Sequence, residues 1–199
     1  MPRNAIVAVV GTGQETEPAV SNARELGRLI AEHGWVLITG GRNAGVMKAA
    51  NEGAKRFDVD DAGRNATVSE RARPNHTPNG LSIGILPNRE TEISPDVDVA
   101  IVTDIGEARN NIIVLSADVV IACGVDDPGT ASEVSLALKA GRPVVLVDAS
   151  DAARAFFTQF SEQITCVDSP REAIKFTEKS LTSSGTNVRN TLPSVARPG

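Results

Sequence analysis

Short apolar runs alternate with longer amphipathic segments along most of this chain. The runs have few polar residues within them, which is typical of parallel strands that are buried on both faces. Between the runs, apolar residues recur at helical spacing, as Leu26, Leu29 and Ile30 do. The seven expected strands are Ala5–Val10, Trp35–Thr39, Leu81–Leu86, Val97–Val102, Val119–Cys123, Pro143–Val147 and Gln163–Val167.

Helical segments separate most of these strands. Ser169 is an expected N-cap for the last helix, because Pro170 and an acidic residue follow it. The alternation of strands and helices with short links predicts an α/β fold with a doubly wound, mainly parallel sheet flanked by helices. The expected helices are Glu17–His33, 46–54, Gly106–Ala117, 128–139, Ala152–Phe160 and 170–181.

Two segments interrupt this rhythm. Residues 57–79 are polar and contain few apolar side chains, so we expect a mobile insertion there. Residues 182–199 are rich in Ser, Thr, Asn and Pro and have few apolar anchors, which predicts a disordered tail. The remaining chain, with 41% hydrophobic residues overall, is expected to form a single domain over 1–181 with a full core.

The amino-acid composition argues against nucleic acid and membrane as partners of this protein. The net charge of −5, the isoelectric point near 5.1 and the aromatic content of 3% argue against a nucleic-acid partner. No run of about 20 apolar residues is present, so no membrane span is expected. The N-terminus lacks the features of a signal peptide, and we expect a cytoplasmic protein. Cys123 and Cys166 lie in apolar runs, which favours buried thiols over a disulfide or metal pair.

Common catalytic and cofactor motifs are absent from the sequence. Gly11-x-Gly13 lacks the third glycine of a dinucleotide fingerprint, and no acidic residue ends the second strand, so NAD is not expected. The chain has no P-loop pattern, no HExxH, no paired CxxC and no GxSxG. We therefore expect no metal site and no serine-hydrolase chemistry.

Glycine-containing turns follow three of the expected strands, at 11–13, 40–45 and 124–130. The carboxyl ends of parallel strands share one edge of a sheet, so these turns should lie together. Glycines there let backbone N–H groups approach a phosphate, and a helix N-terminus adds partial positive charge. One such turn would be explained by a tight connection alone. Three turns, together with Arg109 and Glu133, favour a site for a small anionic ligand.

An ordered set of motifs resembles the LOG-like ("Lonely guy") superfamily, whose members are often mislabelled as lysine decarboxylases. The resemblance covers roughly residues 5–147 and is strongest to the branch of molybdenum cofactor carrier proteins. No PLP-binding lysine motif is recognisable, so decarboxylation is not expected. The motifs are Gly40-Gly41-x-x-x-Gly45-x-Met47, Gly84-Ile85-Leu86-Pro87, Gly106-x-Ala108-Arg109-Asn110, Ser116-Ala117-Asp118 and Gly129-Thr130-x-x-Glu133.

The resemblance implies a Rossmann-like fold and a homodimer or homotetramer, with the helix of Arg109 near the subunit contact. In the enzymatic branch, the family hydrolyses the N-glycosidic bond of nucleoside 5′-monophosphates. There, Arg109 and Glu133 match the functional pair, and a carboxylate could stabilise an oxocarbenium-like centre or orient water. In the carrier branch, the cleft holds a pterin phosphate cofactor without turning it over. The bound ligand is thus expected to be the molybdenum cofactor or a nucleoside monophosphate.

Each candidate residue also has a purely structural interpretation. Arg109 could form a surface ion pair, and Glu133 could only stabilise a helix N-terminus. Thr130 could be an N-cap, and Met47 a packing residue. Arg109 and Glu133 are the catalytic candidates if the protein is an enzyme. The expected cofactor-binding residues are Gly11, Thr12, Gly13, Gly40, Gly41, Gly45, Met47, Arg109, Asn110, Gly129, Thr130 and Glu133.

The sequence departs from the motif of the enzymatic branch at two places, and these departures bear on whether the protein binds a ligand or hydrolyses it. Asn110 stands where the enzymes have Lys, and the glycine loop is longer and contains Asp126 and Asp127. These acids would repel a phosphate unless they point to water or bind a cation. Asn110 and the altered loop favour a binding protein, whereas the retained Arg109 and Glu133 favour a phosphoribohydrolase. A degenerate cleft in a protein that acts through assembly is the third interpretation.

Overall fold

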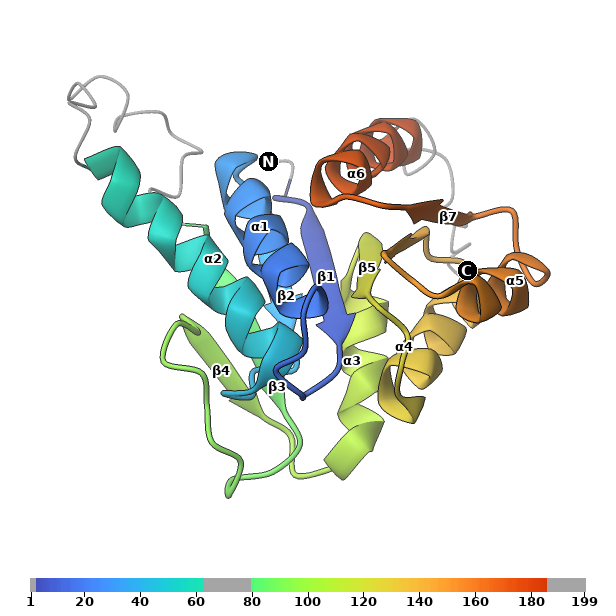
Figure 1. Ribbon diagram of the computed structural model, residues 1–199. Coiled ribbons are helices and arrows are strands. Elements are labelled where there is room, and N and C mark those ends of the chain that lie inside the picture. The colour runs from blue at the N-terminus through green and yellow to red at the C-terminus, as the bar shows by residue number, and fades with distance from the viewer. Residues whose placement is uncertain (1–2, 63–79, 186–199) are drawn as a thin grey trace, which may run out of the picture.

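The computed structural model describes residues 3–62 and 80–185, in which seven strands alternate with helices (Figure 1). The strands are β1 (Ile6–Gly11), β2 (Val36–Thr39), β3 (Ser82–Leu86), β4 (Val99–Val102), β5 (Val119–Cys123), β6 (Val144–Val147) and β7 (Ile164–Val167). The helices are α1 (Ala19–Glu32), α2 (Gly45–Ala62), η1 (Gly106–Ala108), α3 (Arg109–Ser116), α4 (Pro128–Lys139), α5 (Asp151–Thr158) and α6 (Pro170–Gly185).

The strands form one sheet in the order β4-β3-β2-β1-β5-β6-β7, and every pair is parallel. After β1 the chain builds outward to β4, and it then returns so that β5 pairs with the other side of β1. The crevice where this direction reverses is the usual ligand position in an open α/β sheet. The predicted Rossmann-like, doubly wound α/β fold is confirmed.

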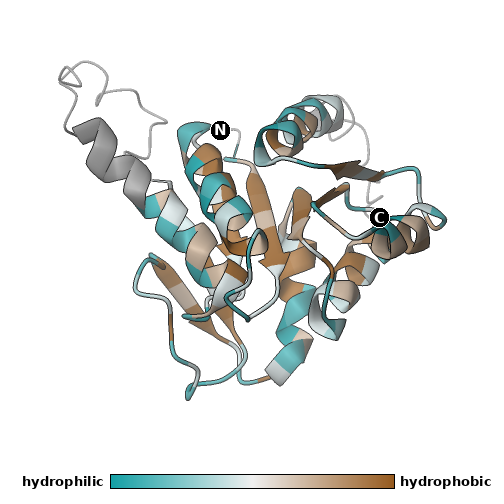
Figure 2. Cartoon of the chain, viewed as in Figure 1, coloured by the Kyte–Doolittle hydropathy of each residue, from teal (hydrophilic) through white to brown (hydrophobic). Residues whose placement is uncertain are grey.

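Helices cover both faces of the sheet (Figure 1). Side chains of α1, α2 and α6 pack on strand residues such as Val7, and those of α3, α4 and α5 pack on residues such as Ala8. Because successive strand side chains point to opposite faces, both faces of β1 are buried. This double burial explains the continuous apolar runs, which appear as the brown strands in the middle of Figure 2.

Two glycines bring α1 and α2 close together. A Cβ on Gly27 would lie 1.9 Å from the carbonyl oxygen of Ala50, and one on Gly53 would lie 1.9 Å from that of Arg24. Only glycine permits this backbone approach. The resulting contact fixes the direction of α2, whose first turn borders the candidate site.

Three predicted element boundaries are wrong. Helix α2 continues to Ala62, because the sequence has no Gly or Pro between Gly53 and Gly63 to end it. Helix α6 likewise continues past Leu181 to Gly185. The segment expected as one helix over Gly106–Ala117 begins with the 3-10 turn η1. The rest of the predicted insertion and tail, 63–79 and 186–199, lies outside the described residues.

The predicted cap of the last helix is confirmed. The amide of Glu172 donates to the Ser169 hydroxyl at 3.4 Å, and that hydroxyl donates to the Glu172 carboxylate at 3.1 Å. The Glu172 carboxylate also accepts from the amide of Asp168 at 3.2 Å, so Ser169 and Glu172 together satisfy free amides at the start of α6. In the part of the chain that the structure describes, no helix is long and apolar enough to cross a membrane.

Candidate functional site

A narrow cavity lies at the carboxyl ends of β1 and β2, beside the loop that joins β5 to α4. Its lining combines bare backbone, two guanidinium groups and three carboxylates, an arrangement suited to a polar ligand. The lining residues are Val9, Val10, Gly11, Gly13, Gly40, Arg42, Met47, Glu107, Arg109, Asn110, Asp127, Gly129, Thr130 and Glu133.

Most residues expected to bind a cofactor meet in this cavity. The first two glycine turns contribute Gly11, Gly13 and Gly40, and α2 contributes Met47. The remaining members come from the start of α3 and the start of α4, and they are Arg109, Asn110, Gly129, Thr130 and Glu133. Parallel strand ends therefore gather residues that are far apart in the sequence, as the spacing of the glycine turns predicts.

Thr12, Gly41 and Gly45 lie outside the lining of this cavity. Gly41 has φ +72°, and a Cβ on it would lie 2.9 Å from the Cα of Gly84, so it permits a close backbone contact. Gly45 has φ +48° and approaches the backbone of the 11–13 turn. The carbonyl oxygen of Thr12 accepts a hydrogen bond from the Val46 amide at 3.0 Å. These residues shape the walls of the site through the backbone.

Arg109 is held inside the cavity rather than on the surface. Its side chain is 5% exposed, although it begins a helix at the molecular edge. The guanidinium fits because Gly40 has no side chain: a Cβ there would lie 2.5 Å from Nη1 of Arg109. The Nε–H of Arg109 is buried without a hydrogen-bond partner, as is Oδ1 of Asn110. Buried polar groups are normally satisfied, so this one points to a ligand contact.

Glu133 faces Arg109 across the cavity. Oε1 of Glu133 lies 4.0 Å from Nη1 of Arg109, and Glu107 approaches Nη2 at 3.7 Å. Burial raises the pKa of Glu133 to about 7; the Arg109 charge opposes this rise, and Asp127 and Glu107 reinforce it. Burial also lowers the pKa of Arg109. The pair is thus close without a direct hydrogen bond, and desolvation dominates both groups.

The β5–α4 loop places its own carboxylate on the helix N-terminus. Asp127 is the N-cap of α4, and its Oδ1 accepts hydrogen bonds from the amides of Gly129 at 2.8 Å and Thr130 at 3.0 Å. Its Oδ2 accepts the Thr130 hydroxyl at 2.6 Å. The interpretation of Thr130 as the N-cap is therefore wrong, because Asp127 is better placed to reach the free amides. Asp127 therefore caps α4 and is not a simple solvated turn residue.

Comparison with known proteins identifies the family. A family model described as the SLOG cluster4 family matches residues 4–60 and 61–174. The chain belongs to the SLOG cluster4 family. This result agrees with the resemblance seen in the glycine motifs and in the segment around Arg109.

Three individual proteins resemble this SLOG cluster4 protein. An uncharacterized protein of Archaeoglobus fulgidus is 38% identical over 138 residues, which are 69% of this chain and 76% of that protein. The molybdenum cofactor binding protein of the phototrophic bacterium Rippkaea orientalis is 42% identical with a TM-score of 0.76, over 90% of this chain and 98% of that chain. A Moco carrier protein of Chlamydomonas reinhardtii is 40% identical with a TM-score of 0.75, over 91% and 99%.

Three polar lining residues were missed as site residues by sequence reasoning, in addition to the strand residues Val9 and Val10. Arg42 belongs to the glycine turn after β2, and its position directly after two glycines was an available signal. Glu107 precedes the Arg109 motif, and nothing in the sequence distinguishes it from an exposed acid. Asp127 was considered as a solvated turn residue or a cation ligand, although Asp followed by Pro at a helix start is typical of an N-cap.

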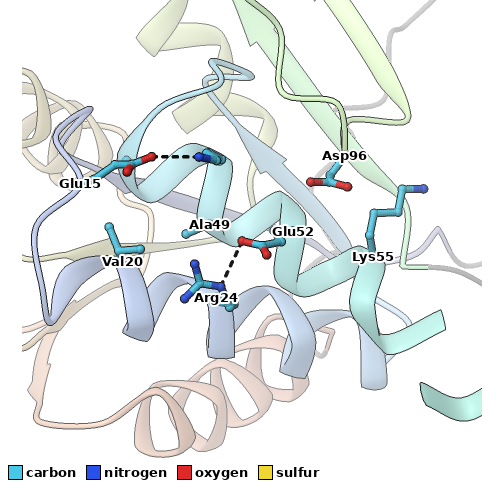
Figure 3. Close-up of a pocket in the computed structure, with 9 residues that line it drawn as sticks. Glu15, Val20, Arg24, Ala49, Glu52, Lys55 and Asp96 are labelled. Atoms are coloured by element: carbon cyan, nitrogen blue, oxygen red, sulfur yellow. Dashed lines mark hydrogen bonds and ion pairs between the residues drawn. The ribbon is translucent and has the colours of Figure 1, made fainter. Parts of the chain in front are cut away.

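A larger groove of about 620 Å³ lies along α1 and α2 (Figure 3); Gly45 lines it, but it shares no lining residue with the cavity around Arg109. Its three cations pair with acids of the chain: Lys48 with Glu15 at 2.9 Å, Arg24 with Glu52 at 3.1 Å, and Lys55 with Asp98. Positive charge in this groove is thus already neutralised by neighbouring side chains. Within residues 3–62 and 80–185, no group of three or more His, Cys, Asp or Glu is placed to hold a metal ion.

Proposed function

We propose that this protein binds an anionic pterin cofactor of the molybdenum cofactor type and holds it without chemical turnover. The observation that carries the proposal is Arg109, a buried cation in the cavity whose Nε–H has no hydrogen-bond partner. Two solved structures at 40% identity or more, named as a molybdenum cofactor binding protein and a Moco carrier protein, support the choice of ligand.

The surroundings of Arg109 favour binding over hydrolysis. Asn110 supplies an amide where a second cation would help to neutralise a phosphate, and its Oδ1 is buried without a partner. An amide offers both a donor and an acceptor, as a polar heterocycle requires. The cavity therefore combines a buried guanidinium and a buried carboxylate with a neutral amide, which fits recognition of a ring with several N–H and C=O groups.

Hydrolysis of a nucleoside 5′-monophosphate is the second candidate, and one observation favours it. Glu133 has a pKa of about 7 and lies 4.0 Å from Arg109, so it could act as a general acid or base at neutral pH. Incubation of the protein with AMP, GMP, CMP and UMP, followed by chromatography of released base, tests this activity. We expect no release, and base release that Glu133→Gln abolishes would replace the carrier proposal with the hydrolase.

Arg109→Met is expected to weaken binding of the molybdenum cofactor by at least about 30-fold, because a buried charge contact is lost. Met keeps the length and apolar stem of the side chain. Anaerobic titration of the purified protein with molybdenum cofactor, read as pterin fluorescence retained on the protein, measures the effect. Arg89→Met removes the same charge from an exposed position outside the cavity and serves as the control.

The expected result for Arg89→Met is wild-type affinity. Equal retention of cofactor by Arg109→Met and wild type would remove Arg109 from the binding site. Equal loss in both variants would instead assign the effect to net charge. Melting temperatures of both variants establish that the comparison is between folded proteins.

We also propose that the protein assembles as a homo-oligomer through the segment from β4 to α3. Strand β4 forms one edge of the sheet (Figure 1), and exposed apolar side chains are concentrated from there to α3. Uncovered apolar edge strands favour association. Six of the nine exposed large hydrophobic residues in the described ranges belong to this segment: Val99, Ile101, Val102, Ile105, Ile112 and Leu115.

Ile101→Lys and Leu115→Lys are each expected to reduce the molecular mass in solution to that of one chain, 20.8 kDa, because a buried lysine at an apolar contact is costly. Light scattering coupled to size exclusion measures the mass. Phe160→Lys alters an exposed apolar residue near α5, beside the opposite part of the sheet, and should leave the assembly intact. A wild-type mass of one chain would contradict the proposal.

A further inference from the structure

The α4 end of the cavity already contains an anion that belongs to the chain. Three donors at this helix start, the amides of Gly129 and Thr130 and the Thr130 hydroxyl, are directed to the Asp127 carboxylate at 2.6 to 3.0 Å. A phosphate at a helix N-terminus uses donors of this kind. A ligand phosphate would therefore have to displace Asp127 and also approach its negative charge.

Two more carboxylates line the cavity. The Glu133 side chain, one turn into α4, is 91% buried with Oε1 4.0 Å from Nη1 of Arg109, and Glu107, just before α3, lies 3.7 Å from Nη2. The cavity measures only about 80 Å³, so a bicyclic ring can enter it by an edge rather than as a whole. Acids on this side attract hydrogen-bond donors and repel phosphate.

Positive charge lies on the other side of the cavity. Arg42 is exposed, and its Nη1 would be 3.9 Å from a Cβ on Gly13, which places it over the turn after β1. Arg109 lies 4.0 Å from Glu133, and its Nε–H is buried and unpartnered. Charges of opposite sign thus lie in one site: Arg42 is exposed over the turn after β1, and Asp127 and Glu133 belong to the start of α4.

We propose that the α4 end of the cavity binds a hydrogen-bond-donor edge of a heterocycle, with Glu133 as the acceptor, and that Asp127 excludes phosphate from this end. The inference rests on the proposed function and defines the ligand's orientation. A pterin or guanine presents an N–H and an adjacent NH₂ on one edge, and both can donate to one carboxylate. Adenine presents a donor beside an acceptor, which a carboxylate does not match.

The first test compares GMP with AMP by calorimetric titration, because both carry the same ribose phosphate. We expect GMP to bind about 10- to 100-fold more tightly, the factor typical of hydrogen bonds to a charged group. In Glu133→Gln, the amide offers a donor and an acceptor that match adenine, so the preference should fall to unity or reverse. A structural role for Glu133 would change both affinities equally.

The second test uses inorganic phosphate with two substitutions at one position. Asp127→Gly frees the three donors and costs helix capping little, so phosphate affinity should rise at least about 10-fold over wild type. Asp127→Asn removes the charge but keeps an oxygen that can accept from the same amides, so it should show a smaller gain. No gain in Asp127→Gly would overturn the exclusion role.

The outcomes separate this inference from the proposed function. Tight binding of molybdenum cofactor together with equal affinities for GMP and AMP would overturn the inference and leave the proposed function standing. Absence of binding by the cofactor and by both nucleotides would overturn both. Preference for GMP that is lost in Glu133→Gln, with gain of phosphate binding in Asp127→Gly, supports the orientation.

Discussion

Gly45→Ala is expected to destabilise the fold by about 3 kcal/mol, within the range of overpacking plus left-handed backbone strain. Its φ is +48°, and a Cβ would lie 2.3 Å from the carbonyl oxygen of Thr12 and 2.6 Å from the carbonyl carbon of Gly13. Both atoms belong to backbone, which cannot rotate away as a side chain can. The turn after β1 and the start of α2 would have to separate, and both border the candidate site.

Thermal unfolding measures this effect, and the midpoint should fall by roughly 6–12 °C for a chain of this length. Gly34→Ala is the matched control, because Gly34 has φ +67° but nothing lies within 4 Å of its Cβ position. It should cost only the backbone strain, about 1 kcal/mol. Equal losses in the two variants would show that the close contact at Gly45 contributes nothing. Gly45→Ala should also weaken cofactor binding, whereas Gly34→Ala should not.

Glu133→Gln is expected to gain about 3 kcal/mol in free energy of unfolding relative to wild type as the pH rises from 4.5 to 8. The pKa of Glu133 in the folded protein is about 7, above its ordinary value of 4.5. The folded state therefore binds the proton more tightly than the unfolded state does. This contribution to stability is complete below pH 4.5 and is lost as the pH rises through 7. A neutral Gln does not titrate, so the variant lacks this loss.

The measurement is the free energy of unfolding by denaturant for both proteins between pH 4.5 and pH 8. The difference between Glu133→Gln and wild type should increase in favour of the variant by about 3 kcal/mol across that range. Glu107→Gln removes an acid that also lies near Arg109 but is 71% exposed, so it controls for the lost charge. Parallel profiles for wild type and Glu133→Gln would show that the Arg109 charge fully offsets the burial of Glu133.

A raised pKa is consistent with both functional candidates, but the Asp127 cap distinguishes them. A hydrolase of nucleoside monophosphates must hold phosphate firmly while the glycosidic bond breaks. Here the best donors of the α4 start are engaged by Asp127. The same two acids that depart from the enzymatic motif therefore have different roles, since Asp127 caps α4 while Asp126 makes none of these bonds. This contrast favours the binding proposal.

The order of the strands along the chain, and the edge of the sheet at which the site lies, could be predicted from hydrophobic runs and glycine turns alone. The strand Val119–Cys123 was predicted with its observed bounds, because a strand buried on both faces requires a continuous apolar run. The convergence of Gly11, Gly40 and Gly129 also followed from sequence, since all ends of parallel strands meet at one edge. Hydrophobic runs and glycine turns were sufficient to predict these features, because each depends on the path of the backbone and not on how side chains pack.

Which side chains enter the cavity depends on contacts between distant segments and could not be predicted from the sequence. The direction of Asp127 depends on the loop that precedes α4, and the entry of Arg109 depends on the missing side chain of Gly40, about seventy residues earlier. Neither relation leaves a periodic signal in the sequence. The burial that raises the pKa of Glu133 likewise arises from packing between distant segments. Such packing depends on three-dimensional contacts, whereas hydrophobic periodicity reports only which face of an element is buried.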